Sequence, residues 1–206
     1  MRHAFRLPLH IREAVRHHVE RAVAETDPAR FRQEPKYTSS LITRLEGTPY
    51  EGRDGYIRLK ATDVDDRARG SAESRFGADF GIVAEVSDGS ATVRKAILVQ
   101  AKLGFVSELP DTERTELIRQ IRNMKRVVGA PKVMEIPAFG AMRDPRIISG
   151  NKLLGGGPYQ SIRLADYFVT RITTTLDGNT DSEVVEAIGH SDLRKLDVLA
   201  RFEIEA

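Results

Sequence analysis

Two strand-like segments joined by a short turn constrain this chain more than any other feature. Residues 79–87 and 91–102 are rich in apolar and β-branched side chains, and Asp88–Ser90, with Gly89 at its centre, separates them. A glycine-containing turn between two such runs is typical of a β-hairpin. The sequence therefore predicts an antiparallel pair of strands near the middle of the chain.

The turn also fixes which residues of the two strands face each other. If the turn is Asp88–Ser90, Ser87 pairs with Ala91, and Asp79 lies across from about Val99, to within one residue. This register brings the Asp79 carboxylate beside Gln100.

The second strand ends in an unusual way. Its apolar residues 97–99 indicate a buried strand, yet Gln100 and Lys102 follow, two apart and therefore on the same side of the sheet. Buried polar groups need partners, such as a metal, a substrate or one another. With Asp79 added, a carboxylate and an amide oxygen suit a hard cation such as Mg²⁺, and a nearby lysine suits a phosphate.

Patterns elsewhere in the chain predict helices and strands on both sides of the hairpin. Apolar stripes predict helices at Leu9 to about Thr26, about Tyr37 to Glu46, Asp111 to about Val128, Ser161–Thr175, Glu183–Ile188 and Leu193–Phe202. Further strands are expected at Tyr56–Ala61, Lys132–Phe139 and Arg146–Ser149, and loops at Ala61–Gly77 and Asn151–Pro158.

This order of elements predicts the fold class and the domain organisation. The 206 residues suffice for one domain with a sizeable core. We expect an α/β fold with a mixed central β-sheet flanked by helices and with extra N- and C-terminal helices. The core would span about 34–140, and a C-terminal helical extension about 160–206.

The composition excludes several kinds of site. Cysteine is absent, which rules out disulfides, thiolate metal sites and cysteine nucleophiles and fits a reducing cytoplasm. The 32 basic and 30 acidic residues give a net charge of +2, which is below that of a passive nucleic-acid binder. No apolar run approaches the roughly 18–20 residues of a membrane span, so we expect a cytoplasmic protein with no membrane partner.

The residues Asp79, Gln100 and Lys102 resemble the PD-(D/E)xK signature of the restriction-endonuclease-like nucleases, in the variant in which QxK replaces (D/E)xK. The expected order of helix, strands, helix and strand from about Tyr37 to Phe139 also resembles the family core. The resemblance implies a restriction-endonuclease-like fold and a Mg²⁺-dependent reaction, with Mn²⁺ as a substitute. Asp79, Gln100 and Lys102 would be catalytic.

The resemblance implies further site residues on two helices. The family places a glutamate on the helix before the first core strand, and Glu34 is the preferred candidate, with Glu46 as its substitute. The metal ligands would then be Asp79, Gln100 and Glu34. Gln120 matches a glutamine that supports the site in the family. The neutral Gln100 removes one negative charge from the site, which implies weaker metal binding, one metal instead of two, or a site without activity.

These expectations define two candidate functions. The first is an endodeoxyribonuclease that acts on duplex DNA, with RNA not excluded. Its activity would be controlled by homo-oligomerisation or by a regulatory protein partner, within antiviral defence or repair. This last step is an analogy from the family. The second is a catalytically silent nuclease-fold module that binds nucleic acid or a protein.

Overall fold

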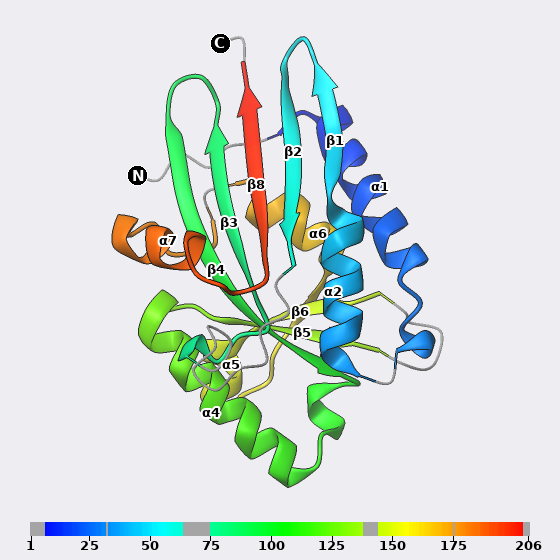
Figure 1. The fold of residues 1–206 in the computed structure, drawn as a ribbon, viewed down its shortest axis with the longest axis vertical. Coiled ribbons are helices and arrows are strands. Elements are labelled where there is room, and N and C mark those ends of the chain that lie inside the picture. The colour runs from blue at the N-terminus through cyan, green and yellow to red at the C-terminus, as the bar shows by residue number, and fades with distance from the viewer. Residues whose placement is uncertain (1–6, 32, 64–74, 138–143, 175, 204–206) are drawn as a thin grey trace.

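A mixed sheet organises the molecule, as the computed structural model shows (Figure 1). The structure describes residues 7–31, 33–63, 75–137, 144–174 and 176–203. Eight strands within these ranges form one sheet, in the spatial order β1-β2-β8-β3-β4-β5-β6-β7. The strands are Gly47–Gly52 (β1), Gly55–Thr62 (β2), Phe80–Ser87 (β3), Thr92–Leu103 (β4), Lys132–Ile136 (β5), Arg146–Ser149 (β6), Ser161–Arg163 (β7) and Lys195–Phe202 (β8).

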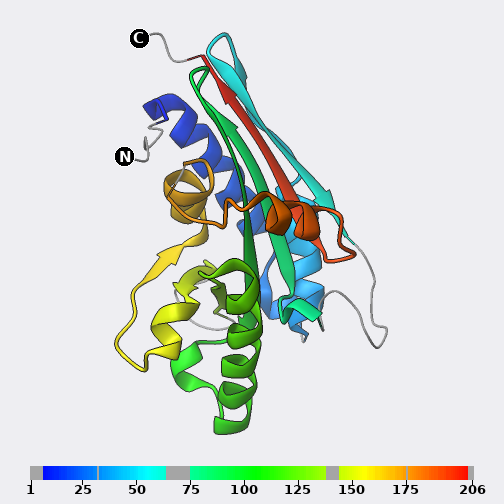
Figure 2. The ribbon, with the colours of Figure 1, turned by 90° about the vertical axis from the view of Figure 1, so that its left-hand side faces the viewer.

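Helices cover both faces of the sheet (Figure 2). The helices are Leu9–Glu25 (α1), Glu34–Leu45 (α2), Asp111–Val128 (α4), Gly150–Leu154 (α5), Leu164–Tyr167 (α6) and Ser182–Gly189 (α7). Shorter helical turns are Pro28–Arg30 (η1), Val106–Glu108 (η2) and Phe168–Ile172 (η3). One apolar core joins the sheet to α1, α2, α6 and η3, and a second joins its other face to α4 and α7. The mixed α/β class predicted from the sequence is confirmed.

The predicted hairpin is present as β3 and β4. Its turn holds Gly89 at a φ of 83°, which suits glycine, and the Asp88 side chain accepts hydrogen bonds from the backbone N–H groups of Ser90 and Ala91. Phe80 pairs with Val99, one residue from the central expectation and within its allowance. The predicted helix Asp111–Val128, the strand Arg146–Ser149 and a helix at Glu183–Ile188 are also confirmed.

The prediction of a helix at Leu193–Phe202 is wrong. Residues Lys195–Phe202 form β8, which lies between β2 and β3, antiparallel to the first and parallel to the second. Alternate residues of the strand are buried in the core, namely Leu196, Val198, Ala200 and Phe202. This two-residue period identifies a strand, and the C-terminal part of the chain is therefore not the purely helical extension expected.

Three other segments differ from the sequence predictions. The edge strand β1, which was not predicted, carries no alternating pattern and contains Pro49, a residue tolerated at sheet edges. The segment Ser161–Thr175 is not one helix, because it begins as β7 before α6 and η3. The expected loop Asn151–Pro158 begins within α5. Most of the expected loop at Ala61–Gly77 lies outside the described residues.

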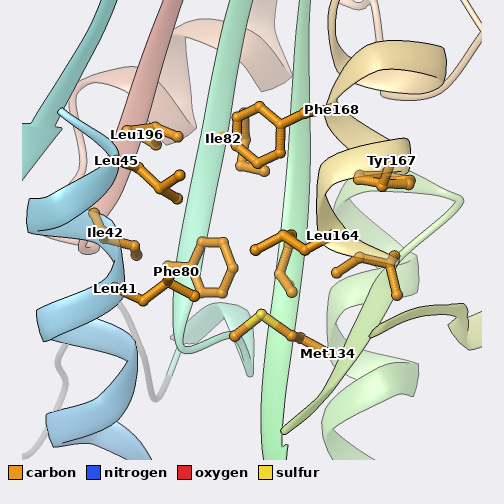
Figure 3. Close-up of a pocket in the computed structure, with 12 residues that line it drawn as sticks. Leu41, Ile42, Leu45, Phe80, Ile82, Met134, Leu164, Tyr167, Phe168 and Leu196 are labelled. Atoms are coloured by element: carbon orange, nitrogen blue, oxygen red, sulfur yellow. The ribbon is translucent and has the colours of Figure 1, made fainter. Parts of the chain in front are cut away.

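Apolar packing fixes α2 on the sheet. Leu41 and Ile42 of α2 lie against Phe80 of β3 in a core that Phe168 closes from the other side (Figure 3). A cavity of about 10 Å³, roughly the space for one water-sized sphere, remains among these side chains. The dense packing around it holds the C-terminal half of α2 on the sheet, and the helix carries Glu34 at its other end, beside the end of β4.

Candidate functional site

Asp79 lies immediately before β3, in the position that the hairpin register predicts. Its backbone N–H donates to the Val99 carbonyl at 3.0 Å, which extends the β3–β4 ladder by one residue. The side chain is buried, with 6% of the residue exposed. Its Oδ2 accepts two hydrogen bonds at 2.6 Å, one from Gln100 Nε2 and one from the backbone N–H of Ala101. Asp79 and Gln100 are therefore in direct contact.

Gln100 and Lys102 lie near the end of β4, on the sheet face that α4 covers. Leu98, two residues before Gln100, packs into the apolar core that joins the sheet to α4 and α7. Ala101, between Gln100 and Lys102, packs into the core on the other face, which includes α2. Gln100 is 2% exposed, so its amide is removed from bulk solvent. The buried amide needs partners, and Asp79 supplies one.

Glu34 reaches the same end of β4 from α2. This helix begins at Glu34, three residues before the predicted start, with Pro35 in its first turn. Glu34 Oε1 lies 2.8 Å from Lys102 Nζ, and Oε2 accepts the backbone N–H of Leu103 at 3.2 Å. Of the two predicted glutamates, Glu34 lies at the site, whereas Glu46 is the exposed C-cap at the other end of α2.

Gln120 lies on α4 beside the segment that leads to Asp79. Gly77 adopts a φ of 71°, and a Cβ added there would lie 3.0 Å from the Gln120 backbone oxygen. Glycine therefore permits the close approach of this segment to α4. The Gln120 side-chain oxygen is buried and has no hydrogen-bond partner among the described residues. The structure thus places Gln120 near the site without assigning its side chain a contact there.

Two further carboxylates near the site escaped the sequence analysis. Glu135 of β5 pairs in register with Lys102 and is 2% exposed, and its Oε1 accepts the Val106 N–H at 2.8 Å. Burial raises the pKa of the Glu135 carboxyl. The available signal was a single acidic residue in a short strand whose other residues, apart from Lys132 at its start, are apolar.

The second carboxylate, Glu116, lies on the exposed face of α4. A hydrogen bond from Arg119 at 2.8 Å lowers the pKa of the Glu116 carboxyl, and the positive charge of Lys102 lowers it further. Lys102 is thus within electrostatic reach of α4 as well as of α2. No sequence pattern distinguished Glu116 from the other charges of that helix.

The donor set at this site suits a hard cation. Asp79 offers a carboxylate, and Gln100 offers an amide oxygen once a half-turn of its terminal bond exchanges nitrogen and oxygen. Within the described ranges, no three histidine, aspartate or glutamate side chains gather closely enough to hold a metal ion. Mg²⁺ commonly uses one or two protein carboxylates and fills its other positions with water and phosphate oxygens, so Asp79 and Gln100 fit such an ion.

None of the described helices is both long and apolar enough to cross a membrane.

Comparisons of the chain with protein-family models, with curated proteins and with solved structures find no match.

Proposed function

We propose that this protein is a metal-dependent nuclease that hydrolyses phosphodiester bonds. One observation carries the proposal: side chains from three separate segments meet at the end of β4. Gln100 contacts Asp79 at 2.6 Å across 21 residues of chain, and Lys102 contacts Glu34 at 2.8 Å across 68 residues. Charged and polar side chains that meet at the end of a buried strand are typical of a catalytic or ligand-binding site.

The residues have distinct tasks in this proposal. Asp79 supplies the negative charge that attracts the cation, and Gln100 supplies a neutral oxygen. When bound, Mg²⁺ or Mn²⁺ would activate a water molecule and offset charge on the phosphate. Lys102, whose side chain is 13% exposed, is desolvated enough for its ammonium to interact strongly with a phosphate oxygen.

The fold supports the proposal through the order of its elements. From α2 to β5 the chain runs through β1, β2, β3, β4 and α4, and this order of helix, strands, helix and strand resembles that of a restriction-endonuclease-like core. The parallel pairing of β4 with β5 across α4 agrees with that order. The insertion of β8 between β2 and β3 is a departure from the simple core expected. A restriction-endonuclease-like core thus forms part of the proposal.

The substrate we propose is duplex DNA, cut internally, with RNA as the second nucleic acid to test. The net charge of +2 gives little general attraction to nucleic acid, so the contacts must be local. We further propose control by self-association or by a regulatory protein, within antiviral defence or repair, by analogy with such nucleases.

One observation favours the alternative, a binding module without activity. Asp79 Oδ2 already accepts two N–H groups, and the neighbouring position holds the neutral Gln100 instead of a second carboxylate. A site satisfied in this way can persist as a structural remnant, because its buried polar atoms have partners without a cation.

Cleavage assays separate the two functions. Plasmid, linear duplex DNA, single-stranded DNA and RNA would be incubated with Mg²⁺ or Mn²⁺, with and without EDTA. We expect metal-dependent cutting that Asp79→Asn and Lys102→Ala abolish and that Glu46→Gln, at the far end of α2, leaves unchanged. Cutting by Asp79→Asn at the wild-type rate would refute the assigned site. Failure of the wild type to cut any substrate would favour the binding module.

A further inference from the structure

Glu34 was expected to be a third metal ligand, and its contacts indicate a different role. We propose that Glu34 is a positioning residue, which aims the Lys102 ammonium from the end of α2, and that it is not a ligand of the cation. The inference rests on the proposed nuclease function, because it assigns the task of one residue in that site.

The two carboxylate oxygens of Glu34 are both engaged with β4. Oε1 accepts from Lys102 Nζ at 2.8 Å, and Oε2 accepts from the backbone N–H of Leu103 at 3.2 Å. Donors to the two oxygens come from successive residues, so the carboxylate is fixed in orientation as well as in place. The Lys102 ammonium, 2.8 Å from Oε1, would repel a cation placed on that oxygen.

The two donors to Asp79 Oδ2 differ from the two donors to Glu34. Asp79 Oδ2 accepts from Gln100 and from Ala101, whereas Glu34 accepts from Lys102 and Leu103. The two carboxylates belong to no common group of three acidic or histidine side chains in the part of the chain described. The site therefore divides into an Asp79–Gln100 pair that suits the cation and a Glu34–Lys102 pair that suits the phosphate.

Because the Glu34–Lys102 pair is partly buried, Glu34 can fix the position of the Lys102 ammonium. The side chains are 21% and 13% exposed, so solvent screens their attraction only in part. A long lysine side chain has many rotamers, and a fixed carboxylate selects among them. Because α2 packs tightly on the sheet, its first residue is a rigid point from which to hold the ammonium.

The test uses Glu34→Gln in the full chain, with Glu46→Gln as the matched control on the same helix. An amine-acylating reagent followed by mass spectrometry reports how accessible Lys102 is, and exposed Lys36 serves as the internal reference. We expect labelling of Lys102 relative to Lys36 to rise about threefold or more in Glu34→Gln, since one charged hydrogen bond is lost. Glu46→Gln should match the wild type.

Calorimetry with Mn²⁺ tests whether Glu34 is a ligand. Glu34→Gln alone leaves the positive charge of Lys102 unbalanced, so the informative protein is the double variant Glu34→Gln/Lys102→Met, which keeps the net charge of the pair. We expect its Mn²⁺ affinity to stay within about twofold of the wild type, whereas Asp79→Asn should lose about tenfold or more. The inference would be overturned by a comparable loss in the double variant, or by unchanged Lys102 labelling in Glu34→Gln. Neither measurement needs turnover, so a wild type that binds Mn²⁺ without cutting would refute the nuclease function alone.

Discussion

Asp79 is a buried acceptor for two N–H donors, and in the proposed function it would also supply the negative charge for a cation. Its contacts with Gln100 and Ala101 at 2.6 Å satisfy polar groups that would otherwise be buried without partners. Removing the acceptor altogether, as in Asp79→Ala, should therefore destabilise the metal-free protein by about 1–3 kcal/mol. Asp79→Asn keeps an acceptor oxygen and is the better variant for separating binding from folding.

Gln100→Glu tests the cation site at the level of a single charge. The new carboxylate would lie against Asp79, where two buried negative charges repel each other and one must take up a proton. We expect the melting temperature without metal to fall and the increase on adding Mn²⁺ to exceed that of the wild type, since the ion binds only the folded state. Thermal melts with and without Mn²⁺ measure both effects. An increase no larger than that of the wild type would argue against a cation between these positions.

At the scale of elements, a buried lysine of β4 connects η3 to the sheet through hydrogen bonds. Lys95 of β4 is fully buried, and its Nζ donates to the Arg171 carbonyl at 2.6 Å and to the Thr174 carbonyl. Burial lowers the pKa of Lys95 to about 7, against an ordinary value of 10.5; the nearby Asp177 raises it and Lys132 lowers it. Between about pH 7 and pH 10.5, the folded protein therefore binds fewer protons at Lys95 than the unfolded chain does.

This difference fixes the sign of a pH dependence. The contribution of Lys95 to stability should rise with pH above about 7, and below that value it should be a constant penalty, because both states are then protonated. Lys95→Met should flatten the pH dependence of the free energy of unfolding, measured by urea titration from about pH 7 to 9. It also removes the lysine donor from both carbonyls, at a cost of about 1–3 kcal/mol, although the Arg171 carbonyl keeps a hydrogen bond from Thr174 Oγ1 at 3.3 Å. An unchanged slope in the variant would show that Lys95 is charged throughout.

The elements differ in how much of them the sequence could reveal. The β3–β4 hairpin was predictable because its turn and its two apolar runs are local features, and its register placed Asp79 beside Gln100. The strand β8 was not, because LDVLARF fits a helical stripe as well as an alternating strand until its neighbours are known. The contact between Glu34 and Lys102 was not predicted for a related reason: a contact across 68 residues depends on how α2 packs, which no local pattern encodes.

At the scale of the whole molecule, β8 lies between β2 and β3 and joins the β1–β2 part of the sheet to the part that begins with β3. The sequence predicts one core that holds both parts and does not include β8. The strand β8 pairs with β2 along Gly55–Thr62 and with β3 along Gly81–Ser87. Its buried side chains Leu196, Val198 and Phe202 each contribute roughly 1.5–3 kcal/mol. Against a typical total stability of about 5–15 kcal/mol, the loss of this strand is comparable with the stability of the entire fold.

A truncation tests this dependence. A chain that ends at Asp192 would expose the facing edges of β2 and β3 and leave their apolar side chains uncovered. We expect it to lose cooperative urea unfolding and Mn²⁺ binding together, although Asp79, Gln100, Lys102 and Glu34 all remain. A chain that ends at Glu203 keeps all of β8 and is the matched control, expected to unfold as the full chain does. If the shorter chain instead unfolds cooperatively at the wild-type midpoint, β8 is peripheral and residues 34–140 form a core that folds without it.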